Sequence, residues 1–530
     1  MGSPPGLAGA TFSAGTRLDA WSRLRRSDVD LLVIGAGITG AAVAYCAAAR
    51  GSRVALVDKA DFAGGTSSRS SRLIHGGLRY LLHGQVRLVT HSLQEQVRLS
   101  RLAPHLVRPQ AFLLPLYRDA PVPPVLTRAL MFFYHTLRPL NGRLTFQRLD
   151  PAATLAQERL LRREGLLGGL LYYEYVTHDA RLVLETVLAA VDHGALALNY
   201  VGFVDFLTSR GRVVGGILQD QLTGEVLDLR ARAVVNAAGP WSDLLVRPLA
   251  AGRRHLRLSK GSHILIPRAR LPLAHGITLL ARDGRGLMAR PDGDVVFVGP
   301  TETEYDGDPS AVAADEDDRD YLLAVIRGYF PEANLGPADV VGMMVGLRPL
   351  YDQSSRPAGE ISRAYETVWG PPGLLSVLGG KLTLHRRAAE DALRFLEREC
   401  GWSADGGVAE PLPGARWRGA PDVLAEELRR AGARPESVSH LLQTYGSRAA
   451  LFLDLLRAAP GSAGAIVGGL PYIWAEASFA REHEMAIRPE DFLHRRSDLA
   501  LQAAAAGRTV PDQLAQQWTA AGKVAARRTS

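Results

Sequence analysis

The chain has 530 residues, a length that fits about two to four domains. Hydrophobic residues make up 47% and charged residues 22% of it, which excludes wholesale disorder, collagen and coiled coil. Two cysteines, Cys46 and Cys400, are too few for a disulfide framework or an iron–sulfur cluster, so we expect a reducing compartment.

The net charge of +8 suits an anionic partner, which could be nucleic acid, anionic lipid or a phosphorylated small molecule. Lysine occurs only at Lys59, Lys260, Lys381 and Lys523, and the other 58 basic residues are arginines. In such a chain, a lysine within a glycine-rich motif indicates that a compact ammonium is needed there. Lys260 and Lys381 have that setting.

The N-terminal residues 1–27 are rich in Gly, Pro and Ser and predict a flexible leader. No apolar stretch before a cleavage site is present, which argues against secretion. The first long charge-free run, Leu31 to Ala49, has 19 residues and raises the question of a membrane span. Its glycines, and its division into a β-type half and an alanine-rich half, argue against one.

This run instead opens a nucleotide-binding pattern. Residues 30–34 predict a buried strand, which is followed by the turn Gly35-Ala-Gly-Ile-Thr-Gly40 and a helix. A second strand at 53–57 ends in Asp58. Strand, glycine-rich turn, helix, strand and acid in this order are typical of a dinucleotide fold.

Each residue of the pattern has a physical role. Gly35 makes the tight turn, Gly37 lets the backbone approach a pyrophosphate, and Gly40 lets helix and strand pack closely. The N-terminus of the helix offers free N–H groups and a positive dipole end to the phosphates. Asp58 is placed to accept hydrogen bonds from a ribose.

The segments that follow favour FAD over a nicotinamide cofactor. A Ser/Gly/Arg loop at 64–80 replaces the next helix and strand of a nicotinamide domain. A helix at 179–193, hairpins at 202–228 and a buried strand at 233–239 come later. A βαβ start, a three-stranded meander and a returning strand together predict an FAD domain.

Several motifs make the resemblance more specific. The chain resembles the FAD-dependent glycerol-3-phosphate dehydrogenase family, from about Asp28 to about Leu501, in six segments: TSSRSSRLIHGGLRYL (66–81), DARL (179–182), VNAAGPW (235–241), KGSHI (260–264), GLRPL (346–350) and GGKLT (379–383). The resemblance implies an α/β architecture, in which an FAD-binding dinucleotide fold of the glutathione-reductase or amino-acid-oxidase type carries an antiparallel-sheet substrate domain. It also implies a C-terminal helical domain. The expected boundaries are a leader at 1–27, the FAD-binding domain with its interleaved cap at 28–400, and the helical domain at 401–530.

The glycine-rich turn and these segments supply the expected cofactor-binding residues. They are Gly35, Gly37, Gly40, Asp58, Thr66, Ser67, Ser68, Ser71, Gly76, Gly77, Ala238, Gly239, Gly380 and Lys381. No metal site is expected.

Cations near glycines are the candidate contacts for a substrate phosphate: Arg79, Lys260, Arg348, Arg363 and Lys381. Arginine matches a phosphate bidentately, and lysine meets it as a point charge. The resemblance implies that the phosphate and hydroxyl contacts are Arg79, Tyr80, Arg348, Arg363 and Lys381, with Thr383 as a further match.

The reaction implied by the resemblance is oxidation of sn-glycerol 3-phosphate to dihydroxyacetone phosphate, with hydride transfer from C2 to flavin N5. A base must reach the C2 hydroxyl. We expect His263 to be that base and His75 to lie near the flavin, because both have small neighbours that permit close approach. The cations, Arg348 among them, are expected to stabilise anionic reduced flavin.

Two departures from the family pattern concern the substrate. The chain has Thr301-Glu302 where the family usually shows Thr-Asp, and Leu384-His385-Arg386 where it usually shows Thr-Tyr-Arg. An oxidase that uses oxygen remains an alternative within the same fold. A basic flavoprotein that binds nucleic acid is an alternative of another class, against which no lysine-rich tract or RNA-binding signature is visible.

The family implies a peripheral enzyme on the cytoplasmic face of the membrane that passes electrons to quinone, and a homodimer is possible. Residues 121–143 suit this role, because an apolar stripe with flanking arginines can lie among lipid headgroups. The stripe consists of Leu126, Leu130, Phe133 and Leu137, beside Arg128, Arg138 and Arg143. A stripe that packs on the protein's own core is the alternative.

Overall fold

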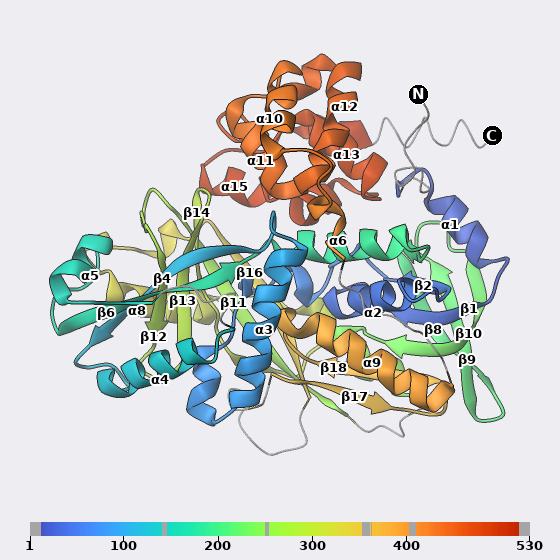
Figure 1. Cartoon of the computed structure of the whole chain (residues 1–530), viewed down its shortest axis with the longest axis horizontal. Coiled ribbons are helices and arrows are strands. Elements are labelled where there is room, and N and C mark those ends of the chain that lie inside the picture. The colour runs from blue at the N-terminus through green and yellow to red at the C-terminus, as the bar shows by residue number, and fades with distance from the viewer. Residues whose placement is uncertain are drawn as a thin grey trace.

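A computed structural model describes residues 12–139, 146–249, 254–351, 361, 363–401 and 410–518. Figure 1 shows two β-sheets and, above them, a lobe of C-terminal helices. The α/β class and the helical C-terminal domain that the sequence predicts are therefore both present.

The first sheet has the topology expected of a nucleotide-binding domain. Its strands follow the order β17-β18-β10-β1-β2-β7, and all neighbours run parallel except β17 and β18. The strands are β1 (Val29–Ile34), β2 (Val54–Val57), β7 (Leu196–Leu198), β8 (Val201–Ser209), β9 (Arg212–Asp220), β10 (Val226–Asn236), β17 (Tyr365–Trp369) and β18 (Leu374–Gly379).

Alternating side chains of β1 build a core on each face of this sheet. Leu31 and Val33 pack in the cluster that includes the helices α2 (Ile38–Ala48), α6 (Asp179–Asp192) and α9 (His385–Cys400). Leu32 and Ile34 pack on the other face with the meander of β8, β9 and β10. Since both faces are covered, the strand is apolar from Leu31 to Ile34.

Strand β10 differs from the expectation in one respect. The sequence suggests a meander followed by a separate returning strand, but one continuous strand serves both purposes. Its first half pairs antiparallel with β9, where Leu229 lies opposite Gly216. Its second half pairs parallel with β1, where Val235 lies opposite Val33. The two predicted elements are joined because no turn residue interrupts residues 226–236.

The second sheet lies where the sequence predicts an antiparallel-sheet cap domain. Its order is β15-β11-β14-β13-β12-β4-β6-β3, with β16 beside β11 and β5 beside β6. All pairs are antiparallel except β12 and β4. The strands are β3 (Leu73–Ile74), β4 (Arg108–Tyr117), β5 (Gln147–Leu149), β6 (Leu166–Val176), β11 (Leu256–Pro267), β12 (Gly276–Leu280), β13 (Gly286–Asp292), β14 (Val295–Gly299), β15 (Thr303–Tyr305) and β16 (Gly342–Tyr351).

Helices cover this sheet and make up the C-terminal lobe. Those around the sheet are α3 (Val86–Leu102), α4 (Pro124–Thr136), α5 (Pro151–Gln157) and α8 (Glu316–Tyr329), while α7 (Ser242–Val246) follows β10. Those of the lobe are α10 (Pro421–Arg430), α11 (Pro435–Tyr445), α12 (Phe452–Ala458), α13 (Trp474–His483), α14 (Pro489–Asp491), the π-helical turn Phe492–Arg496 and α15 (Leu499–Ala505).

The predicted flexible leader is wrong for its second half. Residues 17–24 form helix α1 (Arg17–Leu24), and Trp21 is buried against the first sheet. The guanidinium of Arg17 is also buried and makes two hydrogen bonds to the carboxylate of Asp220, at 2.8 and 3.1 Å. A buried ion pair of this kind fixes the helix in place. Residues 1–11 lie outside the described residues.

Helix α4 forms where the sequence predicts a helix, but its faces differ from the prediction. Thr127, Met131 and Tyr134 are buried, whereas Leu126 and Phe133 are exposed. Arg138 is also buried, and its guanidinium lies 3.6 Å from Glu174, so it does not face solvent. Arg143 lies outside the described residues. The predicted stripe thus mixes two faces of one helix.

The charge-free run at 31–49 divides between β1 and α2, as expected. None of the described helices combines the length and the apolar character that crossing a bilayer requires.

Candidate active site

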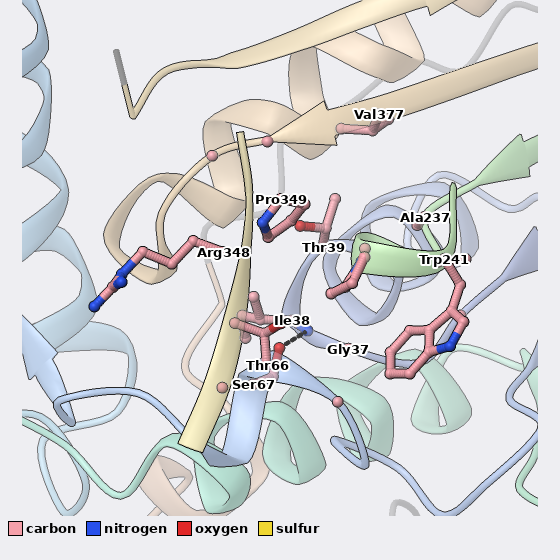
Figure 2. A pocket seen from close by; sticks show the side chains of 18 of the residues that line it. Gly37, Ile38, Thr39, Thr66, Ser67, Ala237, Trp241, Arg348, Pro349 and Val377 are labelled. Atoms are coloured by element: carbon pink, nitrogen blue, oxygen red, sulfur yellow. Dashed lines mark hydrogen bonds between the residues drawn. The ribbon is translucent and has the colours of Figure 1, made fainter. Parts of the chain in front are cut away.

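A large cavity of about 780 Å³ lies where the two sheets meet. Its walls come from the turn before α2, the loop at 64–75, the end of β10, strands β11 and β16, and residues 379–385 after β18. In Figure 2, Arg348 extends from β16 on one side of the view and Trp241 lies on the other, with the start of α2 between them. The volume lies within the range of small-molecule and cofactor sites.

The glycine-rich turn has the geometry that the sequence predicts. Gly35 has a φ of +101°, which favours glycine. A Cβ on Gly40 would lie 1.8 Å from the carbonyl oxygen of Gly35, so only glycine lets the helix pack here. A Cβ on Gly37 would meet only the side chain of Ser67. One on Gly239 would meet nothing within 4 Å, so a ligand can approach both backbones closely.

Side chains of the following loop complete the turn. Ser67 Oγ accepts the N–H of Ile38 at 3.0 Å, which is drawn as a dashed line in Figure 2. Thr66 Oγ1 donates to the carbonyl of Leu347 at 2.6 Å and so ties the loop to β16. Because these bonds fix the start of α2, its dipole is aimed at the cavity.

Asp58 ends β2 beside the turn. Its carboxylate accepts the N–H groups of Ala36 at 2.7 Å and Ala60 at 2.9 Å. Burial raises the pKa of Asp58 to about 6. Each carboxylate oxygen keeps a free lone pair. The residue can therefore hold the turn and accept a ribose hydroxyl as well. These groups suit an FAD molecule laid along the cavity.

Most of the predicted site residues line this cavity or the smaller one beside it. The larger cavity is lined by Gly35, Gly37, Asp58, Thr66, Ser67, Ser71, His75, Tyr80, Ala238, Gly239, His263, Arg348, Arg363, Gly380, Lys381 and Thr383. Gly77 and Arg79 line the smaller cavity, of about 260 Å³. Gly40, Ser68 and Gly76 line neither of these two cavities.

Lys381 lies against the backbone of the Ser/Gly/Arg loop at 64–80. Its ammonium donates to the carbonyls of His75 at 2.9 Å and Gly76 at 3.3 Å, and Thr383 Oγ1 donates to the same His75 carbonyl at 3.3 Å. Burial lowers the pKa of Lys381 to about 7. Near pH 7, and without a bound anion, the Lys381 amine is therefore protonated in only part of the molecules.

Arg348 is a second cation without a carboxylate partner among the described residues. Its guanidinium donates to the carbonyls of Thr301 at 3.2 Å and Lys260 at 3.4 Å. It lies on Gly261, where a Cβ would come within 2.3 Å of it. Burial and the nearby Arg79 lower the pKa of Arg348 to about 10. A bound anion would relieve this cost.

Arg79 and Arg363 differ from these two cations, because Glu302 already pairs with both. Its carboxylate lies 3.4 Å from Arg79, and Arg363 donates to its other oxygen. The departure at position 302 thus places the longer acid between two of the predicted phosphate contacts. At the other departure, His385 lines the large cavity, and its Nδ1 forms a hydrogen bond with the carbonyl of Leu382 at 2.7 Å.

Both predicted histidines are held neutral. Burial, with Arg348 next in importance, lowers the pKa of His263 to about 3. Burial and the charges of Lys381 and Arg79 hold the pKa of His75 well below its usual range. The Nε2 atom of His263 lies 2.9 Å from Ser71 Oγ, and its buried Nδ1 has no hydrogen-bond partner among the described residues. His263 can therefore accept a proton at Nδ1.

Lys260 does not belong to the site, contrary to the sequence prediction. Its ammonium pairs with Asp315 at 2.5 Å and with Asp318 at 2.8 Å, and it lines neither cavity. Its glycine neighbour, Gly261, makes room for Arg348 instead.

Sequence reasoning missed the side of the cavity opposite Arg348 in Figure 2. Trp241 lies there, with Lys59 Nζ 4.3 Å from the centre of its ring. The indole N–H donates to Ser310 Oγ at 3.0 Å. Trp241 is the last residue of the family segment VNAAGPW (235–241), and this segment could have indicated its place in the site. Among the described residues, no three His, Cys, Asp or Glu side chains gather as metal ligands.

Comparison with known proteins agrees with this geometry. Residues 30–386 match the family described as FAD dependent oxidoreductase. The chain belongs to this family. Residues 409–525 match a second family, described as the C-terminal domain of alpha-glycerophosphate oxidase. The cofactor of the chain is therefore FAD, as the turn, Asp58 and the open glycines indicate.

Named relatives within this family extend the comparison. The chain is 34% identical over 490 residues to the aerobic glycerol-3-phosphate dehydrogenase of Staphylococcus haemolyticus, covering 89% of this chain and 87% of the relative. A solved glycerol-3-phosphate dehydrogenase from Bacillus halodurans, complexed with FAD, is 31% identical with a TM-score of 0.78 and coverage of 96% and 94%. Glycine oxidase from Geobacillus kaustophilus shares the fold, with 20% identity, a TM-score of 0.54 and coverage of 74% and 100%.

We expect different outcomes when Gly37 and Gly40 of the turn are substituted. Gly40→Ala places a methyl against the Gly35 carbonyl and should cost about 1–3 kcal/mol of stability, with loss of flavin. Gly37→Val should leave the apoprotein folded but expel FAD, because the side chain fills the pyrophosphate space. Flavin absorbance after gel filtration and the thermal midpoint measure both effects. Full flavin content in Gly37→Val would contradict this placement.

The pKa of Lys381 predicts how anion affinity varies with pH. Sulfate keeps two charges between pH 6 and 8.5, so it isolates the state of the protein. Below pH 7 the ammonium is charged, and above it the charge is lost. Sulfate affinity should therefore fall about thirtyfold over this interval, since each pH unit above a pKa costs about a factor of ten and the interval ends about 1.5 units above pH 7. Flavin absorbance during sulfate titration reports it, and Lys381→Met should show a weak, flat profile.

Proposed function

We propose that the protein oxidises sn-glycerol 3-phosphate to dihydroxyacetone phosphate. The observation that carries the proposal is a pair of cations, Arg348 and Lys381, in the cavity that also holds the dinucleotide turn. Neither has a carboxylate partner in the described part of the chain. A phosphate dianion is the kind of ligand that neutralises such a pair. The names of the relatives support this choice of substrate.

Bound FAD would accept at N5 the hydride that leaves C2 of the substrate. The chain supplies position and proton transfer. Arg348 and Lys381 orient the phosphate. His263 accepts the C2 hydroxyl proton at Nδ1, which no described residue contacts by a hydrogen bond. The phosphate beside Arg348 offsets the cationic field that opposes protonation of His263. Arg79 and Tyr80 line the smaller cavity, and Thr383 donates to the carbonyl of His75.

Anaerobic mixing of the purified protein with glycerol 3-phosphate tests the reaction directly. Flavin absorbance should bleach with this substrate and not with glycerol. Arg348→Ala and Lys381→Ala each remove a charge-assisted contact worth about 1.5–3 kcal/mol, so the substrate concentration for half-maximal bleaching should rise about 10- to 150-fold. Arg270→Ala, at a surface ion pair with Asp339, is the matched control and should change nothing. Unaltered affinity in both site variants would place the phosphate elsewhere.

We further propose that electrons leave to a membrane quinone. Two observations favour a lipid-soluble acceptor over oxygen. The smaller cavity runs from His75 and Arg348 to the apolar side chains Leu82 and Leu130. Leu82 also belongs to an apolar patch on α4, the start of α3 and the turn at 78–83, which contacts both helices. The patch consists of Leu82, Val86, Val125, Leu126, Phe132 and Phe133, all of them exposed.

This apolar patch is the proposed site of contact with an anionic membrane surface. Phe132 is 63% and Val125 75% exposed, which is unusual for such large apolar side chains in a soluble setting. Arg87 next to Val86 is exposed, and Arg128 on α4 is half-buried, so both can meet headgroups. The patch replaces the stripe predicted from sequence, since Arg138 is occupied inside the protein.

Vesicle flotation tests the patch. The protein should float with anionic vesicles at low salt, and less so at high salt. Phe132→Ser with Phe133→Ser should reduce partitioning more than tenfold, because each phenylalanine contributes about 1.5–3 kcal/mol when buried. Val423→Ser, at an equally exposed apolar position on α10, is the control. Two results together would contradict the quinone proposal and favour the oxidase alternative. They are no binding to anionic vesicles, and faster reoxidation of the reduced flavin by oxygen than by a soluble quinone.

A further inference from the structure

The loop that carries Ser71 contains a buried cation that the reaction does not use. Arg72 follows Ser71 directly, is 4% exposed and has a φ of +56°, which a residue with a side chain rarely adopts. Ser71 Oγ lies 2.9 Å from Nε2 of His263. Arg72 is thus separated from the hydrogen-bond partner of His263 by a single peptide bond, so a shift of Arg72 would move Ser71 and change the orientation of the proposed base.

The partner of Arg72 comes from the C-terminal lobe. Asp498, just before α15, receives two hydrogen bonds from the Arg72 guanidinium, at 2.6 and 2.7 Å. Two other acids lie farther away, Asp179 at 3.8 Å and Asp292 at 3.5 Å. His178 Nε2 also lies 3.2 Å from Asp498. The short bidentate pair thus sets where the guanidinium lies among three carboxylates.

Other buried pairs already attach the lobe to the FAD domain. Glu484 accepts two bonds from Arg181, at 2.6 and 2.9 Å, and Arg496 makes two bonds to Asp61, at 2.6 and 2.9 Å. Neither pair touches Ser71 or His263. Attachment of the lobe therefore does not depend on Asp498 alone, and this residue is free to have a more local role.

We propose that Asp498 is a positioning residue for His263, so that the C-terminal lobe contributes to the chemistry of a site that it does not line. Asp498 fixes Arg72, Arg72 fixes the backbone of Ser71, and Ser71 orients the imidazole. This inference rests on the proposed role of His263 as proton acceptor. Without the Asp498 charge, the guanidinium is drawn toward Asp179 and Asp292, and Ser71 moves with it.

The test compares Asp498→Asn with Glu484→Gln in the holoenzyme. Both substitutions remove a buried charge from the same interface, but only the first touches Arg72. Asp498→Asn should lower the rate constant of anaerobic flavin reduction at least tenfold, with flavin content and half-saturating substrate within twofold. Glu484→Gln should lower the thermal midpoint by several degrees and leave the rate constant within twofold. Circular dichroism of the bound flavin monitors the site independently of turnover.

A double-mutant cycle with Ser71→Ala separates positioning from general loosening. If Asp498 acts through Ser71, the two losses in rate do not add. Additive losses, or an unchanged rate in Asp498→Asn, would overturn the inference. If that variant is insoluble, Asp498→Glu decides in the same way, because it keeps the charge but displaces the carboxylate. If His263→Asn reduces the flavin at the wild-type rate, the proposed role of His263 is wrong. The effect of Asp498→Asn can still be measured in that case, so the two failures can be told apart.

Discussion

Buried pairs between arginine and carboxylate hold together segments that lie far apart in the chain. Arg17 pairs with Asp220, Arg181 with a glutamate 303 residues later, and Arg496 with Asp61, 435 residues earlier. Breaking one such pair leaves a charge in the interior at a cost of about 3–5 kcal/mol, so each pair tolerates few alternative arrangements. None of these paired residues lines the cavity between the two sheets, so the pairs hold the segments around it together. The excess of arginine in the composition thus serves the interior as well as the surface.

The sequence predicts best where structure depends on neighbouring residues. The run from β1 to Asp58 follows local rules of strand period, glycine turn and helix start, and the structure confirms it. His263 and Arg348 also line the cavity, where small residues beside a polar one led us to expect a close approach, and their roles stay predictions. Gly40 is informative for this reason, since its missing side chain makes room for the Gly35 carbonyl.

Prediction fails where a partner distant in sequence decides the outcome. Lys260 has the expected glycine neighbour, but Asp315 and Asp318 remove it from the site. Helical periodicity locates α4 but cannot tell which apolar face is covered, because that depends on Met131 and Tyr134 packing below it. Residues 17–24 look flexible by composition, yet Asp220 captures Arg17. Asp498 carries no local signal, since only the fold brings it to Arg72.

The continuous strand β10 has a consequence for how the protein is made. Strand β1 is synthesised first, but its neighbour β10 ends at Asn236 and the next strand, β18, begins only at Leu374. At about 5–20 residues per second, roughly twenty seconds to over a minute of translation separates β1 from β18. The edge of β1 waits for β10 during the first part of that time, and the edge of β10 then waits for β18. Nascent chains of this protein are therefore most exposed to aggregation before FAD can bind, and supply of the cofactor cannot shorten that interval.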